Sequence, residues 1–126
     1  MPVKSYSDLI AWQKAMELTV KIYKYTEYFP KSEVYGLQSQ LRRSAVSIPS
    51  NIAEGQGRRS TKEFLHFLSN AKGSLAEAET QIILAFRLGF FNQEQQKELL
   101  KQTDEMSRIL SGLRFSLQNK RQSKIQ

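Results

Sequence analysis

Apolar residues recur every three or four positions along most of the chain, which is the spacing of one face of an α-helix. Three prolines and six glycines divide the pattern into four segments that each keep this period. No segment alternates apolar and polar residues as a half-buried strand does. The sequence therefore predicts four helices, over residues 8–29, 32–54, 60–89 and 92–118.

The first predicted helix is apolar around more than half of its circumference. One stripe comprises Leu9, Trp12, Met16, Val20 and Tyr23, and a second comprises Ala11, Ala15, Leu18, Ile22 and Phe29. A single core contact needs a narrower stripe, so the pattern predicts a helix buried on two sides, one of them against another subunit. The apolar residues expected to lie off the core stripes are Leu18, Ile22, Leu65, Ile83, Leu84, Leu100 and Phe115.

Local signals mark several helix ends. Residues 60–63 (STKE) form a capping box, and Asn92 with Gln95 forms a second. Pro49 lies inside the second helical pattern, where it removes a hydrogen bond and predicts a kink or break. We expect nearby serines to satisfy the freed backbone groups, and Gly55 and Gly57 to end the segment.

Helices of about 20 to 25 residues with short connections predict an all-α fold, an antiparallel up-down-up-down four-helix bundle. Residues 1–118 form this single domain, and residues 119–126 are expected to be a basic flexible tail. The wide apolar stripe and the off-core residues favour a ring-forming oligomer.

Composition narrows the classes of protein that fit. The 126-residue chain has no run of about 18 apolar residues, so no transmembrane helix is expected. Its start lacks the apolar stretch of a signal peptide. The absence of cysteine excludes disulfides, thiol catalysis and cysteine-bound metal, and fits the cytoplasm.

Three stretches carry a family resemblance: DLIAWQKAM at 8–16, QLRRSAVSIPSNIAEG at 40–55 with GRRSTKEF at 57–64, and SLAEAETQ at 74–81. They resemble the bacterial four-helix-bundle proteins encoded by intervening sequences within 23S ribosomal RNA genes. This resemblance implies a homopentameric ring and says little about activity. A more distant likeness, to the accessory protein of diversity-generating retroelements, implies a role with RNA.

No enzyme constellation emerges from the sequence. Glu63 and His66 have the Glu-x-x-His spacing of di-iron bundles, but such a site needs two of these motifs and the chain has one histidine. His66 also points away from the apolar face of its helix. The stretch from Gly55 to Arg58 lacks the strand and the GK[ST] ending of a phosphate loop. We expect no catalytic residue, metal or cofactor.

The charge is the unusual quantity, with 19 lysines and arginines against 12 acidic residues, a formal +7. The excess lies in residues 31–60, with five basic and two acidic residues, and in residues 91–126, with seven and four. Arginine pairs bind phosphate well. The candidate RNA-binding residues are therefore Arg42, Arg43, Arg58, Arg59, Lys120 and Arg121.

Two interpretations of these residues stay open. The leading one is a non-enzymatic homo-oligomeric bundle that binds RNA through a basic surface. The alternative is a protein-interaction scaffold in which the arginines pair with Glu33, Glu54, Glu63 or a neighbouring subunit in the ring. Four tyrosines near the first loop fit base stacking but are expected to be core and interface residues: Tyr23, Tyr25, Tyr28 and Tyr35.

Overall fold

The computed structural model describes residues 5–125, and the side chains of residues 5–120. All regular structure in this part of the chain is helical. In order, the elements are η1 (Tyr6–Asp8), α1 (Ile10–Thr26), η2 (Lys31–Glu33), α2 (Leu37–Gln56), α3 (Thr61–Arg87) and α4 (Gln93–Ile125). The predicted all-α, four-helix fold is confirmed.

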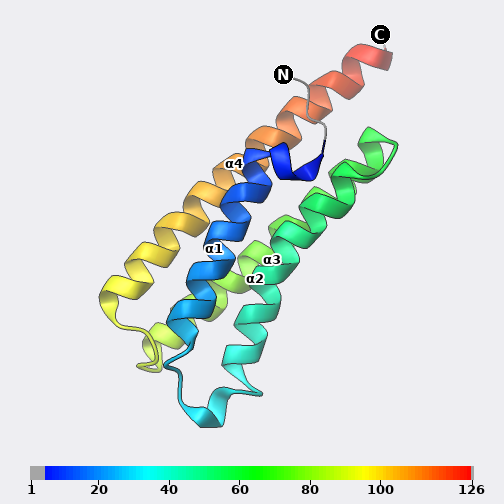
Figure 1. Ribbon diagram of the computed structural model, residues 1–126. Coiled ribbons are helices and arrows are strands. Elements are labelled where there is room, and N and C mark those ends of the chain that lie inside the picture. The colour runs from blue at the N-terminus through cyan, green and yellow to red at the C-terminus, as the bar shows by residue number, and fades with distance from the viewer. Residues whose placement is uncertain (1–4, 126) are drawn as a thin grey trace.

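Each long helix packs against the helices before and after it, and α1 also packs against α4. Within the described residues α2 and α4 do not touch, so they are diagonal in the bundle. Figure 1 shows the helices running up and down, with the α2–α3 turn and both chain ends at one end of the bundle. The α1–α2 and α3–α4 loops lie at the opposite end.

The core shows which side of α1 faces the bundle. Leu18 and Ile22 are almost completely buried, at 1% and 0% exposure, so their placement off the core stripes was wrong. Ala11 and Ala15 lie on the same buried side, where small side chains allow close helix approach. The other stripe reaches the surface through three residues that are 38% to 50% exposed: Met16, Val20 and Tyr23.

The remaining off-core predictions divide into two groups. Leu84 and Phe115 are exposed, at 45% and 65%. Leu65, Ile83 and Leu100 are half-buried. The helix periodicity therefore identified the outer side chains of α3 and α4 better than those of α1, whose two apolar stripes were equally good candidates for the core.

The predicted capping signals are present in the structure. Ser60 Oγ accepts a hydrogen bond from the Glu63 N–H at 3.1 Å. At the start of α4, Asn92 Oδ1 accepts from the Gln95 N–H at 2.8 Å, and Gln95 Oε1 accepts from the Asn92 N–H at 2.9 Å. These caps satisfy backbone groups that a helix leaves free at its first turn.

Pro49 stays inside α2 rather than ending it. Its ring nitrogen has no proton to donate to the carbonyl four residues earlier, which belongs to Ala45. That carbonyl accepts a hydrogen bond from the Thr19 hydroxyl of α1 at 3.1 Å. The freed carbonyl is thus satisfied by the neighbouring helix. The expectation that Ser47 or Ser50 would satisfy it was wrong.

Several helix ends also differ from the predicted ones. Helix α1 ends at Thr26 rather than at residue 29, and α2 begins at Leu37 rather than at residue 32. Gly55 is buried within α2, where it lies against α3, and the helix ends at Gln56. At the other boundary, α4 continues to Ile125 instead of ending near residue 118. Residues 119–125 contain no proline or glycine and several good helix formers, so nothing in their sequence stops the helix.

Candidate nucleic-acid interface

Arg42 is bound within its own chain. Its Nε donates to Thr26 Oγ1 at 2.9 Å and its Nη2 donates to the Tyr23 carbonyl at 3.2 Å. The guanidinium also lies over the Tyr23 ring, 4.5 Å from its centroid. Arg42 therefore donates to a carbonyl in the last turn of α1 and connects this end of the helix to α2.

Arg43, the next residue, is exposed and forms no ion pair with any described residue. It lies between two shallow grooves on the outer side of α2. The first, which we call the loop groove, has a volume of about 330 Å³ and is lined by Tyr23, Val34, Gln38, Ser39, Arg42 and Arg43. A phosphate in this groove would meet an arginine whose charge is uncompensated.

The second groove runs between α2 and α3 and measures about 350 Å³. It is lined by Gln40, Arg43, Ser44, Ser47, Ser74, Glu77 and Gln81. Ser74 and Ser47 share a hydrogen bond of 2.8 Å across the two helices. Gln81 Oε1 is buried and accepts no hydrogen bond from the described residues. This groove is polar, and a carboxylate in its lining makes it a poorer anion site than the loop groove.

Arg58 and Arg59 lie at the other end of α2. The helix runs 13 residues, about 20 Å, from Arg43 to its last residue, Gln56, so the four arginines do not form one site. Arg58 pairs with Glu54 at 2.8 Å and lies 5.0 Å from the centroid of the Phe67 ring. This confirms one of the intramolecular salt bridges that the sequence allowed. Arg59 is exposed and has no ion pair among the described residues.

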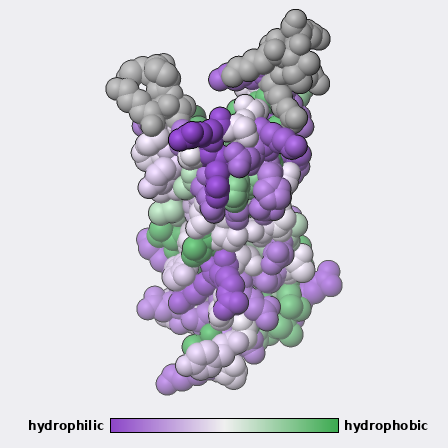
Figure 2. All heavy atoms as spheres, turned by 90° about the vertical axis from the view of Figure 1, so that its right-hand side faces the viewer, coloured by the Kyte–Doolittle hydropathy of each residue, from purple (hydrophilic) through white to green (hydrophobic). Residues whose placement is uncertain are grey.

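The last two candidates are on α4. Lys120 is exposed near the end of the helix, on the same end of the bundle as the α2–α3 turn. The Arg121 side chain lies outside the described residues. Exposed candidates are thus present at both ends of the molecule. Figure 2 shows one face of the bundle, where hydrophilic residues predominate and apolar ones form separate small patches.

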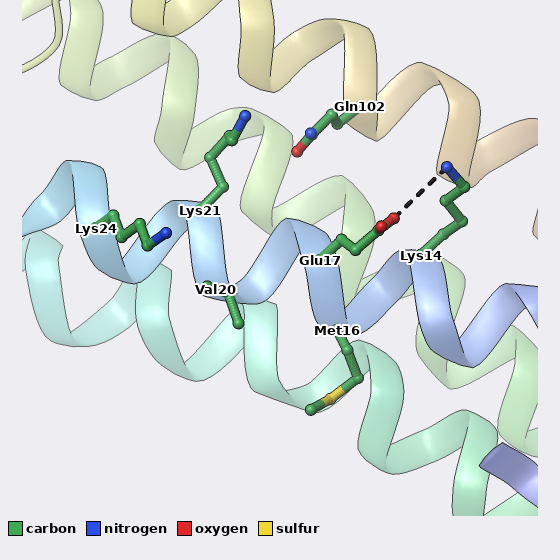
Figure 3. Close-up of a pocket in the computed structure, with 7 residues that line it drawn as sticks. All are labelled: Lys14, Met16, Glu17, Val20, Lys21, Lys24 and Gln102. Carbon is green, nitrogen blue, oxygen red and sulfur yellow. Dashed lines mark ion pairs between the residues drawn. The ribbon is translucent and has the colours of Figure 1, made fainter.

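A third groove, about 570 Å³, lies between α1 and α4 and carries three lysines: Lys14, Lys21 and Lys24 (Figure 3). Lys14 is 3.5 Å from Glu17 and 3.4 Å from Glu105. Lys21 pairs with Glu98 on α4. Because nearby carboxylates neutralise two of the three lysines, this groove is a weaker candidate for a phosphate backbone.

Glu98 collects two donors from α1. The Lys21 ammonium and the Tyr25 hydroxyl both donate to its carboxylate. These hydrogen bonds lower the pKa of Glu98, and its carboxylate raises the pKa values of Lys21 and Tyr25. The cluster therefore connects α1 to α4, and Tyr25 is occupied in this contact.

The described part of the chain does not bring together side chains that would form a metal site. His66 is exposed and contacts the edge of the Phe67 ring at a centroid distance of 5.6 Å. No three acidic, histidine or cysteine side chains within residues 5–120 are grouped as a metal site would require. None of the described helices has the length and apolarity needed to cross a bilayer.

Comparison with known proteins identifies the relatives of this bundle. The sequence model of the 23S rRNA-intervening sequence proteins matches residues 7–112. The chain belongs to that family. A crystal structure of a protein of unknown function from the S23 ribosomal protein family of Bacteroides thetaiotaomicron has a similar fold, with a TM-score of 0.77 and 24% identity. The similarity covers 84% of this chain and 99% of that one. No functionally curated protein matches the chain.

The 23S rRNA-intervening sequence protein family match includes α2 and the α2–α3 turn, and it ends before Lys120 and Arg121. Sequence reasoning did not foresee that Arg42 caps α1, because its acceptor is a backbone carbonyl 19 residues away. It also did not foresee the loop groove, which depends on how residues 34–36 turn before α2. The only sequence signal for this groove was the cluster of tyrosines around the first loop.

Proposed function

We propose that this member of the 23S rRNA-intervening sequence protein family is a non-enzymatic, homo-oligomeric bundle that binds RNA through the outer side of α2. The observation that carries the proposal is Arg43, which is exposed, unpaired among the described residues and flanked by two grooves. Arg59, in the turn that follows α2, adds a second positive charge that no ion pair neutralises among the described residues. In an oligomer each of these charges is repeated, which strengthens attraction to a polyanion.

Binding of this kind acts mainly on phosphates. Arginines that replace condensed counterions make the affinity fall steeply with salt, and they read little sequence. The family name refers to an origin within ribosomal RNA genes and does not identify the bound RNA. We therefore expect moderate affinity for many structured RNAs at low salt.

The test is filter binding of a structured RNA at low and moderate salt. The double variant Arg43→Ala with Arg59→Ala should weaken binding and reduce the salt slope by about 1 for each lost phosphate contact. The matched control, Lys101→Ala with Arg108→Ala, removes two charges from the outer side of α4, diagonal to α2, and should bind almost as the parent does. No binding at low salt, or equal losses in both variants, would contradict the proposal.

A specific observation supports the alternative function, a protein-interaction scaffold. Met16, Val20 and Tyr23 on α1 are exposed, and so is Val46, at 40%, on α2, which packs against α1. Arg43 lies close to this apolar surface, so a neighbouring subunit seated there would cover it. Static light scattering of Arg43→Ala separates the two roles. A smaller assembly assigns Arg43 to ring formation, whereas an intact assembly with weaker RNA binding assigns it to recognition.

A further inference from the structure

We propose that the loop groove binds single-stranded RNA, with Arg43 on a phosphate and the ring of Tyr35 stacked on an unpaired base. This inference rests on the proposed function and specifies the form of RNA that it recognises. It starts from an unusual pair of neighbours. Val34 lines the groove, and Tyr35, the next residue, is 97% exposed.

The loop holds Tyr35 outward through a set of backbone contacts. The Val34 N–H donates to the Lys31 carbonyl at 3.3 Å, and the Gly36 N–H donates to the Glu33 carbonyl at 3.0 Å. Glu33 also caps α2, because its Oε1 accepts from the Leu37 N–H at 2.9 Å. A fixed loop loses little conformational entropy when it binds, so the exposed ring is ready for a ligand.

Gly36 makes this arrangement possible. A side chain there would place its Cβ 2.8 Å from Glu33 Oε1, which is closer than such atoms approach. The Glu33 carboxylate would then have to shift from its position on the Leu37 N–H. The turn that presents Tyr35 is thus built into the sequence and does not arise from a lack of contacts.

The loop groove, which is lined by Val34, the residue before Tyr35, offers the other groups that a nucleotide needs. The stacked guanidinium and ring of Arg42 and Tyr23 form one wall. Gln38 and Ser39 supply an amide and a hydroxyl for hydrogen bonds, and Arg43 supplies an unpaired charge. A space of about 330 Å³ suits a small ligand.

Single-stranded RNA fits these groups better than a duplex does. Proteins that bind single strands combine basic grooves with aromatic rings on which bases stack, and every base offers a face for stacking. Bases within a duplex are already stacked on each other, so an exposed tyrosine finds no free face there. Loops and ends of RNA present unstacked bases.

The experiment is fluorescence anisotropy with a labelled 12-nucleotide oligo(U) and a labelled, fully paired, blunt-ended RNA duplex, using the full chain. Tyr35→Ala should weaken oligo(U) binding about 5- to 100-fold. Tyr35→Phe should retain the parent affinity within about twofold, because stacking needs the ring and not the hydroxyl. Phe115→Ala removes an exposed ring from α4 and serves as the matched control, with no change expected.

Salt dependence separates stacking from charge. Tyr35→Ala should leave the slope of log affinity against log salt unchanged, while Arg43→Ala should reduce it by about 0.7 for the lost phosphate contact. Light scattering of each variant checks that the assembly is intact. Equal losses for Tyr35→Ala and Phe115→Ala, or equal binding of the duplex and oligo(U), would overturn this inference. If Arg43→Ala still weakens RNA binding in that case, the proposed function stands and only the single-strand inference is rejected. If no RNA binds at all, both are rejected.

Discussion

At the scale of single residues, one buried hydroxyl of α1 holds a neighbouring helix. The Thr19 hydroxyl is shared between the Ala15 carbonyl of its own helix and the Ala45 carbonyl of α2. The second acceptor lacks its usual donor within α2, because Pro49 has no N–H to donate. A proline that weakens α2 internally thus creates a contact between α1 and α2.

We predict that Thr19→Val lowers the free energy of unfolding by about 1 to 3 kcal/mol, because the Ala45 carbonyl is then buried without a donor. In a Pro49→Ala background the residue at 49 regains its N–H and can take this carbonyl itself. The same Thr19 change should therefore cost at least about 1 kcal/mol less there. Urea denaturation of the four proteins in a double-mutant cycle measures the difference, and equal costs in both backgrounds would refute the explanation.

A second prediction concerns Glu98 and acid. Its folded pKa is lowered by Lys21 and Tyr25, so its contribution to stability is present near neutral pH and disappears as pH falls below about 4.5, through the folded pKa. Glu98→Gln should lower the melting temperature at pH 7, and the gap to the parent should close as the pH falls through the lowered pKa of Glu98. Circular dichroism melts at several pH values test this.

The control for that experiment is Asp104→Asn. Asp104 pairs with Arg108 one turn away on α4, at an exposed site that connects no second helix. Its loss should change the melting temperature less than Glu98→Gln does. A gap for Glu98→Gln that persists at low pH would mean that the carboxylate acts through its shape and not its charge.

At the scale of the elements, the contact of α2 with α3 depends on a glycine. A Cβ on Gly55 would lie 2.8 Å from Phe67 Cβ and 2.9 Å from Phe64 Cδ1. Gly73, inside α3, has open space in the same position. The two glycines therefore separate the effect of close packing from the low helix propensity of glycine.

We predict opposite signs for alanine at these sites. Gly55→Ala should destabilise the protein by about 1 to 3 kcal/mol, because the two helices must move apart. Gly73→Ala should stabilise it by up to about 1 kcal/mol, because alanine favours the helix and meets nothing. Chemical denaturation measures both, and stabilisation by Gly55→Ala would show that α2 and α3 adjust freely.

Much of the fold was predictable from the sequence, because the spacing of apolar residues, the helix caps and the short loops are all local signals. The capping residues Ser60 and Asn92 placed two helix starts to within a residue. The side of α1 that faces the core was not predictable, since both of its stripes are apolar and only packing chooses between them. The separation of Arg43 from Arg58 was predictable, because it follows from the length of the helix. The hydrogen bond of Arg42 to Tyr23 was not, because it joins residues that are distant in the sequence.

At the scale of the whole molecule, one chain leaves an apolar surface open. It comprises Met16, Val20 and Tyr23 of α1, and Val46 is exposed on α2, which packs against α1. Single exposed apolar residues are ordinary, but a row of them on adjacent helices favours association between copies. The homo-oligomer that we propose would bury this surface.

We predict that Val20→Glu reduces the mass in solution to that of a single chain, because a buried, unpaired charge at a subunit contact is costly. Lys101→Glu also places a glutamate on an exposed helix face, on α4, and should leave the assembly unchanged. Light scattering coupled to size exclusion gives both masses. A Val20→Glu assembly of parental mass would mean that the subunits meet elsewhere.

The up-and-down path of the chain has a practical consequence. Both described chain ends lie at the end of the bundle that carries the α2–α3 turn, while the loop groove lies at the other end (Figure 1). The 27 residues of α3 span about 40 Å between these two ends. If either terminus is tethered to a biosensor surface, Tyr35 and Arg43 therefore face the solution. A dye attached at a terminus would lie too far from the loop groove to report on binding there.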